Sequence, residues 1–181
     1  MDRDGSYLGF DLDLITPAMA VANDLMEIPS FDSQEYSELF SEEKEMLSKL
    51  KKTFLMIAGK AVETFGMELE QQQQIISAAS DIMIEIYLAE SAVLKAEKLA
   101  ATTSIKSCEA QIAMAKLNLY NAVDKINSKG KEAIISFTQE DEQRMLLMGL
   151  KRFTRYTNYP NIVALRKTIA QKLIAENHYC F

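Results

Sequence analysis

The stretch from Gln71 to Ala101 constrains the fold more than any other, because it contains no glycine or proline and repeats apolar residues at a helical period. One stripe of bulky and small side chains predicts a long helix packed against another helix. A second, adjacent stripe predicts that the helix touches two neighbours. The first stripe comprises Ile75, Ala79, Ile82, Ile86, Ala89, Val93, Ala96 and Ala100, and the second Ile76, Met83, Tyr87 and Leu94.

Acidic residues on this helix divide into two groups. Asp81 and Glu85 share the remaining side with Lys95, which predicts a solvated edge. Glu90 instead interrupts the second apolar stripe, where burial requires a cationic or hydrogen-bonding partner. We favour a structural ion pair for Glu90 over a catalytic or metal-binding role. The only histidine, His178, lies near the end of the chain, and no second titratable group is nominated beside Glu90.

A second long helix is predicted to begin at Ser41, since the following "EEKE" places acids where the helix dipole favours them. Gly59 lies beside its apolar stripe, and we predict that another backbone crosses closely there. A large residue at position 59 would then lower the melting temperature. The stripe consists of Leu47, Leu50, Phe54, Ile57, Ala61 and Phe65.

A third helix is predicted from the segment beginning "TTSIKSCEAQ". Cys108 falls on its apolar stripe and is therefore interpreted as a core residue rather than a nucleophile. Gly130 is expected to kink or end this helix, although "KEAIISF" resumes the pattern to Phe137. The stripe consists of Ile105, Cys108, Ile112, Ala115, Leu119, Ala122 and Ile126.

Capping signals mark the remaining elements. Thr138 with Asp141 resembles a capping box that starts a fourth helix, with Leu146, Leu147, Leu150 and Phe153 on its apolar face. Asn161 is expected to cap a last helix, whose Ile162, Leu165, Ile169 and Leu173 face inward. Thr16 and Pro17 predict a short first helix that ends before Pro29.

Together these elements predict an all-α fold. Short loops between long amphipathic helices favour an antiparallel up-and-down bundle of about four main helices with short flanking helices. We assign residues 1–40 to an N-terminal linker with one short helix and residues 41–181 to the bundle domain. With 181 residues, nearly half of them apolar, the chain is long enough for one sizeable core.

Charge distribution and cysteine usage restrict the partners and the cellular compartment expected for the protein. Residues 1–50 carry 12 acidic and 3 basic side chains, whereas residues 140–181 carry 7 basic and 4 acidic ones. Nucleic acid is not expected as a partner of so acidic a chain. Cys108 and Cys180 stand far apart, which favours a reducing cytoplasm over a disulfide scaffold. The start "MDRDGSYLGF" lacks the features of a signal peptide, and no apolar run is long enough to span a membrane.

No motif for chemistry is present in the sequence. It contains no glycine-rich phosphate loop, no Ser-His-Asp set and no cluster with metal-ligand spacing. We therefore predict no catalytic, cofactor-binding or metal-binding residues in this chain, and we interpret it as a binding or packing module.

Several segments resemble the extra C-terminal helical domain of bacterial acyl-CoA dehydrogenases, those built like the very-long-chain enzymes. The resemblance runs from about Leu12 to Phe181. It rests on "LDLITPAMAVANDLMEIPSF", "FLMIAGKAVETFG", "DIMIEIYLAESAVLKAEKL", "QIAMAKLNLYNAVDKINSKGKEAI", "LMGLKRFTRY" and "ALRKTIAQKLIAENHYCF".

The resemblance implies a parent flavoenzyme that oxidises fatty acyl-CoA to 2-enoyl-CoA, with FAD and a glutamate base outside this chain. It implies that the bundle packs against the catalytic core of the same polypeptide and stabilises a homodimer. For some relatives it also implies peripheral contact with the inner face of the membrane. "LKRFTRY" combines basic and apolar residues as such contact requires, but basic residues complementing a helix end explain it better. Two alternatives remain open: a free-standing helical adaptor that binds a partner helix and, more weakly, a small all-helical enzyme.

Overall fold

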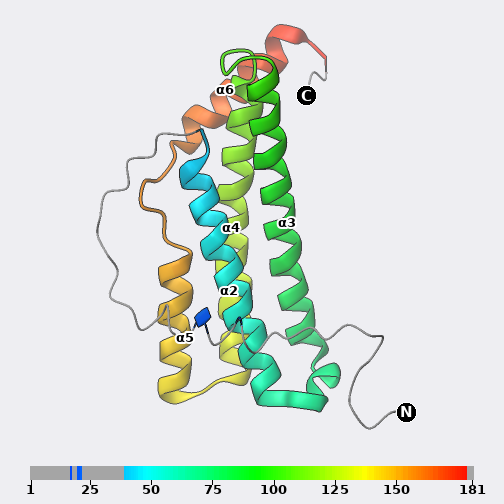
Figure 1. Cartoon of the computed structure of the whole chain (residues 1–181), viewed down its shortest axis with the longest axis vertical. Helices are drawn as coiled ribbons and strands as arrows, with labels where there is room; N and C mark the ends of the chain where they lie inside the picture. Colours follow the sequence, from blue (N-terminus) through cyan, green and yellow to red (C-terminus); the bar gives the residue numbers. More distant parts are fainter. Residues whose placement is uncertain (1–16, 18–19, 22–38, 179–181) are drawn as a thin grey trace.

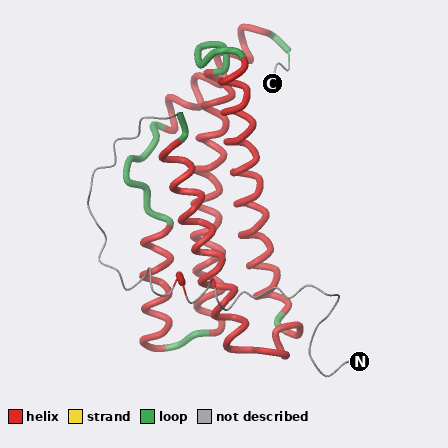
Figure 2. Tube along the Cα trace, viewed as in Figure 1, coloured by secondary structure: helices red, strands yellow, loops and turns green. Residues whose placement is uncertain are grey.

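The computed structural model describes residues 17, 20–21 and 39–178 of the chain. All the regular structure within these residues is helical, which confirms the predicted all-α class (Figure 2). A 3-10 turn, η1 (Gly66–Gln71), joins the first two long helices at the corner that contains the glutamine run. The helices are α2 (Ser41–Phe65), α3 (Gln73–Thr102), α4 (Glu109–Phe137), α5 (Glu140–Phe153) and α6 (Ile162–Glu176).

Helices α2, α3, α4 and α5 run alternately up and down, side by side, as short connections between long helices require (Figure 1). The long helix α3 packs against both α2 and α4, and α5 packs against α2 and α4. Helix α6 lies at the opposite end of the bundle from η1 and packs against α4. None of its residues is fully buried, so the predicted inward face of α6 is only partly covered.

One hydrophobic core fills the space between these helices. Most of the first stripe of α3 is buried in it, with Ile82, Ala89 and Val93 fully inaccessible to solvent. The helical period therefore identified the core-facing side of α3 correctly. Predicted core residues of the other helices are buried too: Leu47, Leu50, Ile57 and Ala61 of α2, Leu119, Ala122 and Ile126 of α4, and Leu146, Leu150 and Phe153 of α5.

The start of α2 agrees with the prediction to within one residue. The helix begins at Ser41, but its N-cap is Phe40, which adopts a left-handed backbone with φ 69°. The Phe40 ring is buried, and Lys116 Nζ of α4 lies 5.9 Å from its centroid. Lys116 also pairs at 2.9 Å with Glu43, so these contacts fasten the first turn of α2 to α4.

The predicted short helix between Thr16 and Pro29 lies mostly outside the described residues. Its three described members, Pro17, Ala20 and Val21, are helical. Val21 is only 4% exposed and belongs to the hydrophobic core. At least one residue of the N-terminal 40 therefore packs with the bundle.

Gly130 does not end its helix, because α4 continues unbroken to Phe137; a kink at this position stays a prediction. A Cβ atom at Gly130 would lie 2.9 Å from Leu150 Cδ1 of α5 and 3.0 Å from Ile57 Cδ1 of α2. The glycine thus makes room for two core side chains from neighbouring helices. Gly59 is buried on α2, and the close backbone crossing proposed there stays a prediction.

The predicted capping box at Thr138 and Asp141 is wrong. Thr138 is the C-cap of α4, and its hydroxyl donates a hydrogen bond of 2.6 Å to the carbonyl of Ile134. The N-cap of α5 is Gln139, whose side chain makes no capping hydrogen bond. By contrast, Asn161 caps α6 as predicted, since its Oδ1 accepts a hydrogen bond of 3.0 Å from the Ala164 amide.

The third helix begins later than predicted, at Glu109, because residues 103–108 form an irregular connection. Ile105 is consequently outside the helix and 59% exposed. Cys108 is 2% exposed, which confirms its assignment to the interior.

Tyr156 lies in a cluster of three tyrosine rings and carries a buried hydroxyl. Its ring centroid is 6.2 Å from that of Tyr120 and 5.4 Å from that of Tyr159. The hydroxyl has no hydrogen-bond partner within the part of the chain that the structure describes. Burial, reinforced by Glu43 and Asp124, raises the pKa of Tyr156 well above its ordinary value.

Tyr156→Phe is expected to leave the free energy of unfolding at pH 7 unchanged or slightly higher, since it removes an unsatisfied buried hydroxyl and keeps the ring. Because the folded-state pKa is raised, Tyr156 favours unfolding once the unfolded chain ionises above about pH 10. The variant should therefore lose less stability between pH 7 and pH 10.5, as measured by urea unfolding. Tyr159→Phe, at a site that is 68% exposed, is the control. A loss of more than about 1 kcal/mol at pH 7 for Tyr156→Phe would indicate a hidden hydroxyl partner.

Candidate functional site

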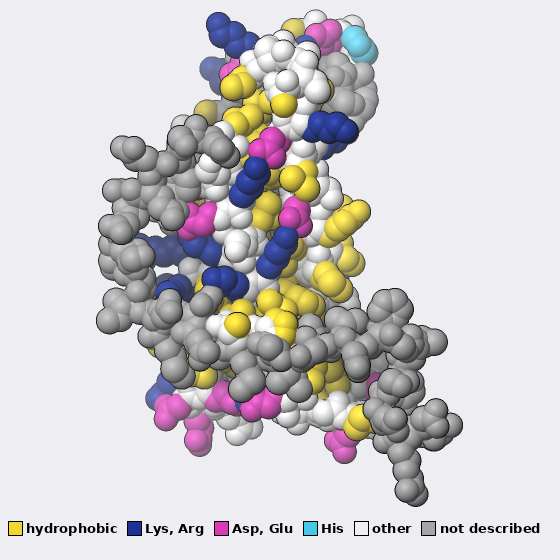
Figure 3. All heavy atoms as spheres, viewed as in Figure 1, with side chains coloured by type: hydrophobic (Ala, Val, Ile, Leu, Met, Phe, Trp, Pro, Cys, Tyr) yellow, Lys and Arg dark blue, Asp and Glu magenta, His cyan; other side chains and the backbone are white. Residues whose placement is uncertain are grey.

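Helix α3 presents an apolar face to the solvent instead of a charged one. We call this the α3 outer face and define it by Met83, Ile84, Tyr87, Leu88 and Leu94, which are 49% to 69% exposed. Figure 3 shows hydrophobic side chains gathered along the side of the molecule that α3 forms. The second stripe is thus exposed at Met83, Tyr87 and Leu94 but half-buried at Ile76, although α3 contacts two neighbouring helices as predicted. Contiguous exposed apolar side chains of this kind mark interaction surfaces.

The acids of α3 lie along its two borders and are paired with lysines of the adjacent helices. On the α4 side, Glu85 lies 2.6 Å from Lys125 and Asp81 lies 3.6 Å from Lys129. These two acids therefore form ion pairs, whereas the sequence predicts only a solvated edge. On the α2 side, Glu90 pairs with Lys51 at 2.6 Å and Glu97 with Lys44 at 2.5 Å. Acidic and basic side chains alternate along this border in Figure 3.

Helix α3 is therefore apolar on two sides, because its first stripe faces the core, as in an ordinary amphipathic helix, and its outer face is apolar as well. In α3 the four acids are engaged at the borders, so the strip between them is apolar and contains no free acid among its described residues. A surface of this composition is suited to burial under another protein surface.

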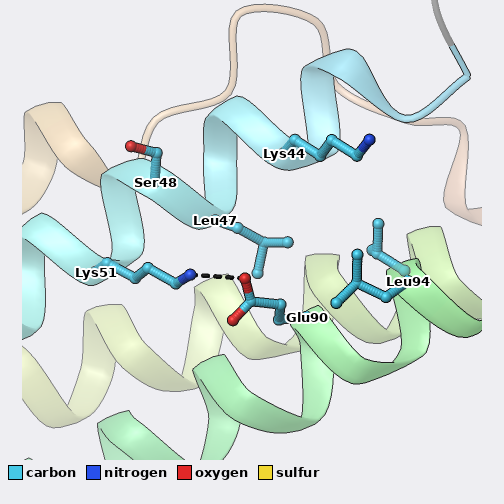
Figure 4. A pocket seen from close by; sticks show the side chains of 7 residues that line it. Lys44, Leu47, Ser48, Lys51, Glu90 and Leu94 are labelled. Carbon is cyan, nitrogen blue, oxygen red and sulfur yellow. Dashed lines mark hydrogen bonds and ion pairs between the residues drawn. The ribbon is translucent and has the colours of Figure 1, made fainter.

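A shallow groove of about 250 Å³ separates α2 from the α3 outer face. Leu47 and Val93 line it, while Lys44, Lys51 and Glu90 form its polar margin. Leu94 belongs both to the groove and to the α3 outer face, so the two are continuous. In Figure 4 Leu47 points from α2 toward α3, between the two lysines.

Glu90 has the cationic partner that its place in an apolar stripe requires. Lys51 Nζ donates a hydrogen bond of 2.6 Å to Glu90 Oε1 across the groove (Figure 4). The side chain of Glu90 is nevertheless 35% exposed, so the pair is not buried as strongly as the apolar stripe implies. Water therefore screens much of the attraction between the two charges.

Glu90→Gln is expected to lower the free energy of unfolding by less than about 1 kcal/mol, because a half-exposed ion pair contributes little and glutamine can still accept a hydrogen bond from Lys51. Urea unfolding at low and at 0.5 M salt measures the effect, which should shrink as salt screens the pair. Glu68→Gln, at an exposed position of η1 for which no ion pair is found within the described ranges, is the matched control. A cost of several kcal/mol would contradict this expectation and indicate a desolvated charge.

Neither the size nor the lining of the groove suits a metal ion or a flavin. The described residues contain no group of three or more metal-ligating side chains positioned to hold an ion. The groove is smaller than the roughly 300–1,000 Å³ of typical small-molecule sites, and its lysines are already paired with Glu90 and Glu97. It does not fit a dinucleotide such as FAD.

The basic segment "LKRFTRY" does not offer apolar side chains to a membrane. Phe153 and Tyr156 are 5% and 6% exposed and belong to the core, while Lys151 and Arg155 point outward. Lys151 and Arg152 lie in the last turn of α5, where they complement the helix dipole. No helix within the described ranges is both long and apolar enough to cross a membrane.

Sequence reasoning missed two members of the α3 outer face, Ile84 and Leu88. They are spaced by four residues and lie beside the second stripe, so they form a parallel row on the same helix. This four-residue spacing is a sequence signal that could have identified both residues as part of an apolar row. The surrounding lysine partners were not predictable, since they come from α2 and α4.

The fold and this surface define an α-helical bundle with an exposed apolar face. The sequence pattern described as "Acyl-CoA dehydrogenase, C-terminal domain" matches residues 49–152, which is more than half of the chain. The chain therefore belongs to the family of acyl-CoA dehydrogenase C-terminal domains.

Two relatives of the chain are much longer proteins. It is 26% identical over 169 residues to a probable acyl-CoA dehydrogenase of Bacillus subtilis (strain 168), covering 93% of this chain and 28% of the relative. The crystal structure of an acyl-CoA dehydrogenase complexed with FAD from Bacillus anthracis superposes with a TM-score of 0.82 at 28% identity, covering 93% of this chain and 28% of the other. The chain thus spans little more than a quarter of the length of these relatives.

Proposed function

We propose that this chain is a non-catalytic structural domain of an FAD-dependent acyl-CoA dehydrogenase and that it stabilises the enzyme's homodimer. The observation that carries the proposal is the asymmetry of the match: 93% of this chain aligns with only 28% of an FAD-complexed relative. A segment that reproduces one helical part of a relative so fully, with a TM-score of 0.82, is suited to the same structural role.

In this proposal the chemistry lies in the part of the enzyme that this chain does not cover. The parent would oxidise fatty acyl-CoA to 2-enoyl-CoA, with FAD taking the hydride and a glutamate taking the proton. The small groove with its paired lysines supports placing the flavin elsewhere. We place the protein in the cytoplasm, in line with its two distant cysteines. Membrane contact through "LKRFTRY" is not proposed, because its aromatic side chains are buried.

The test compares the complete polypeptide that carries this chain with a version from which residues 41–181 are removed. We expect the complete enzyme to contain FAD and to be dimeric by light scattering. The shortened enzyme should lose the dimer or melt at a clearly lower temperature. If its mass, flavin content and melting temperature all match those of the complete enzyme, the structural role is wrong.

The rival function is a free-standing adaptor whose groove holds a partner helix. The groove between α2 and α3, with Leu47 and Val93 in its lining, is the observation that favours it. The reading frame upstream of this chain separates the two functions. An FAD-binding dehydrogenase core in the same frame supports the structural domain, and an independent start site without such a core supports the adaptor.

A further inference from the structure

We infer that the α3 outer face, together with the adjoining groove, is the surface by which this domain docks onto the flavin-binding remainder of the same polypeptide. The inference rests on the proposed function and adds to it the face that is used and the chemistry of the surface it meets. That surface is apolar and helical, with acidic groups at one end.

The size and shape of the face fit a helix as the docking element. Met83 and Leu94 are about 16 Å apart along the axis at the rise of an α-helix. Met83 and Tyr87 form one row with a four-residue step, and Ile84 and Leu88 form a second row beside it. Rows of this kind create the ridges into which a second helix packs. The groove beside Leu94 adds a hollow that can receive one apolar side chain.

Charge at one end of the face specifies the partner further. Lys95 and Lys98 are exposed near Leu94, and no ion pair to either is found within the described ranges. A surface that covers Leu94 therefore has to bring acids to these lysines or leave them in water. A second copy of α3 is a poor candidate, because all four acids on its borders are already held by lysines of its own bundle.

The extent of chain outside this domain favours the remainder of the polypeptide as the occupant. This chain accounts for 28% of the length of its relatives, so most of the folded surface in such a protein lies elsewhere on the same chain. A covalent link keeps that surface at an effective concentration on the order of millimolar, which favours docking within one polypeptide over association between chains.

Cysteine labelling in the complete polypeptide tests the docking face. Tyr87→Cys and Leu94→Cys are made separately in a Cys180→Ser background, with Cys108 left in place because it is 2% exposed. Ile174→Cys on α6 and Met67→Cys on η1 are the controls, since these sites are 78% and 74% exposed. Labelling by N-ethylmaleimide is followed by mass spectrometry and referenced to each variant unfolded in urea, and circular dichroism confirms that each variant is folded.

The docking proposal predicts that the thiols introduced by Tyr87→Cys and Leu94→Cys react at least about tenfold more slowly than those of the controls, because the centre of an interface excludes water. This protection should not depend on protein concentration. It should also survive replacement of residues 1–16 and 22–38 by glycine-serine segments of equal length, which keeps the linker length and the core residue Val21. Reaction at the rate of the controls overturns the proposal. Protection lost on dilution assigns the face to a second copy, and protection lost on that replacement assigns it to the N-terminal segment; both outcomes also overturn it.

The outcome is separable from that of the proposed function. If removal of residues 41–181 abolishes the dimer while Tyr87→Cys stays reactive, the domain is structural but docks through another face. If removal has no effect and Tyr87→Cys is reactive, both proposals are wrong.

Discussion

Gly130→Val is expected to lower the free energy of unfolding by about 3 kcal/mol, the upper end of the usual cost of overpacking a core. Even the first added carbon would lie 2.9 Å from Leu150 Cδ1 and 3.0 Å from Ile57 Cδ1. Both neighbours are almost completely buried, at 2% and 1% exposed, so neither has free space into which it can move. Urea unfolding of the 181-residue chain measures the difference.

A second substitution shows whether the clash with Leu150 is the cause. In a Leu150→Ala background the cost of Gly130→Val should fall by at least about 1 kcal/mol, because contacting residues are coupled. Ser128→Val, at an exposed position of the same helix, should change stability by no more than about 0.5 kcal/mol. Equal costs for Gly130→Val in both backgrounds would exclude Leu150 as the origin of the effect.

Gly130 also illustrates which parts of this fold could be predicted from the sequence. The core-facing stripes of α2, α3, α4 and α5 were predictable, because burial on one side of a helix imposes a period that a single sequence records. The role of Gly130 was not predictable. Helix propensity suggested a kink or a helix end there, whereas the small size of glycine makes room for side chains of α2 and α5.

Local signals failed where a residue could serve either of two adjacent helices. Thr138 has the right spacing to Asp141 for a capping box, but its hydroxyl bonds back to Ile134 and closes α4. Phe40 was unpredictable for another reason, since no sequence rule places a phenylalanine in a left-handed N-cap position. Its ring is buried with Lys116 of α4 beside it, and Lys116 also pairs with Glu43 in the first turn of α2.

The candidate site was predictable in part. The second stripe of α3 was visible as an apolar pattern, and Glu90 was correctly expected to require a cation. An apolar stripe shows that one side of a helix is apolar, but it does not show whether residues of the same domain or of another domain pack against that side. Nor could the sequence identify Lys51 as the partner of Glu90, because that pairing depends on how α2 and α3 align.

Ile82→Ala is expected to lower the free energy of unfolding by about 2–5 kcal/mol, whereas Leu88→Ala should change it by no more than about 0.5 kcal/mol. Both residues lie on α3 and both substitutions remove a large aliphatic side chain. Ile82 is fully buried, so its removal leaves a cavity, but Leu88 is 49% exposed on the outer face. Urea unfolding of the 181-residue chain measures both. Similar costs for the two variants would mean that the outer face is covered within this chain.

The same pair of substitutions behaves differently in the complete polypeptide if the α3 outer face is a docking surface. Leu88 would then also be enclosed, and Leu88→Ala would remove apolar contacts worth about 1–3 kcal/mol. Ile82→Ala should cost the same in both contexts, because its surroundings lie within the bundle. The difference between the two contexts at Leu88, with Ile82 as the internal reference, therefore measures how much the rest of the enzyme contributes to covering α3. A cost at Leu88 that stays near zero in the complete polypeptide would show that this face remains open to solvent.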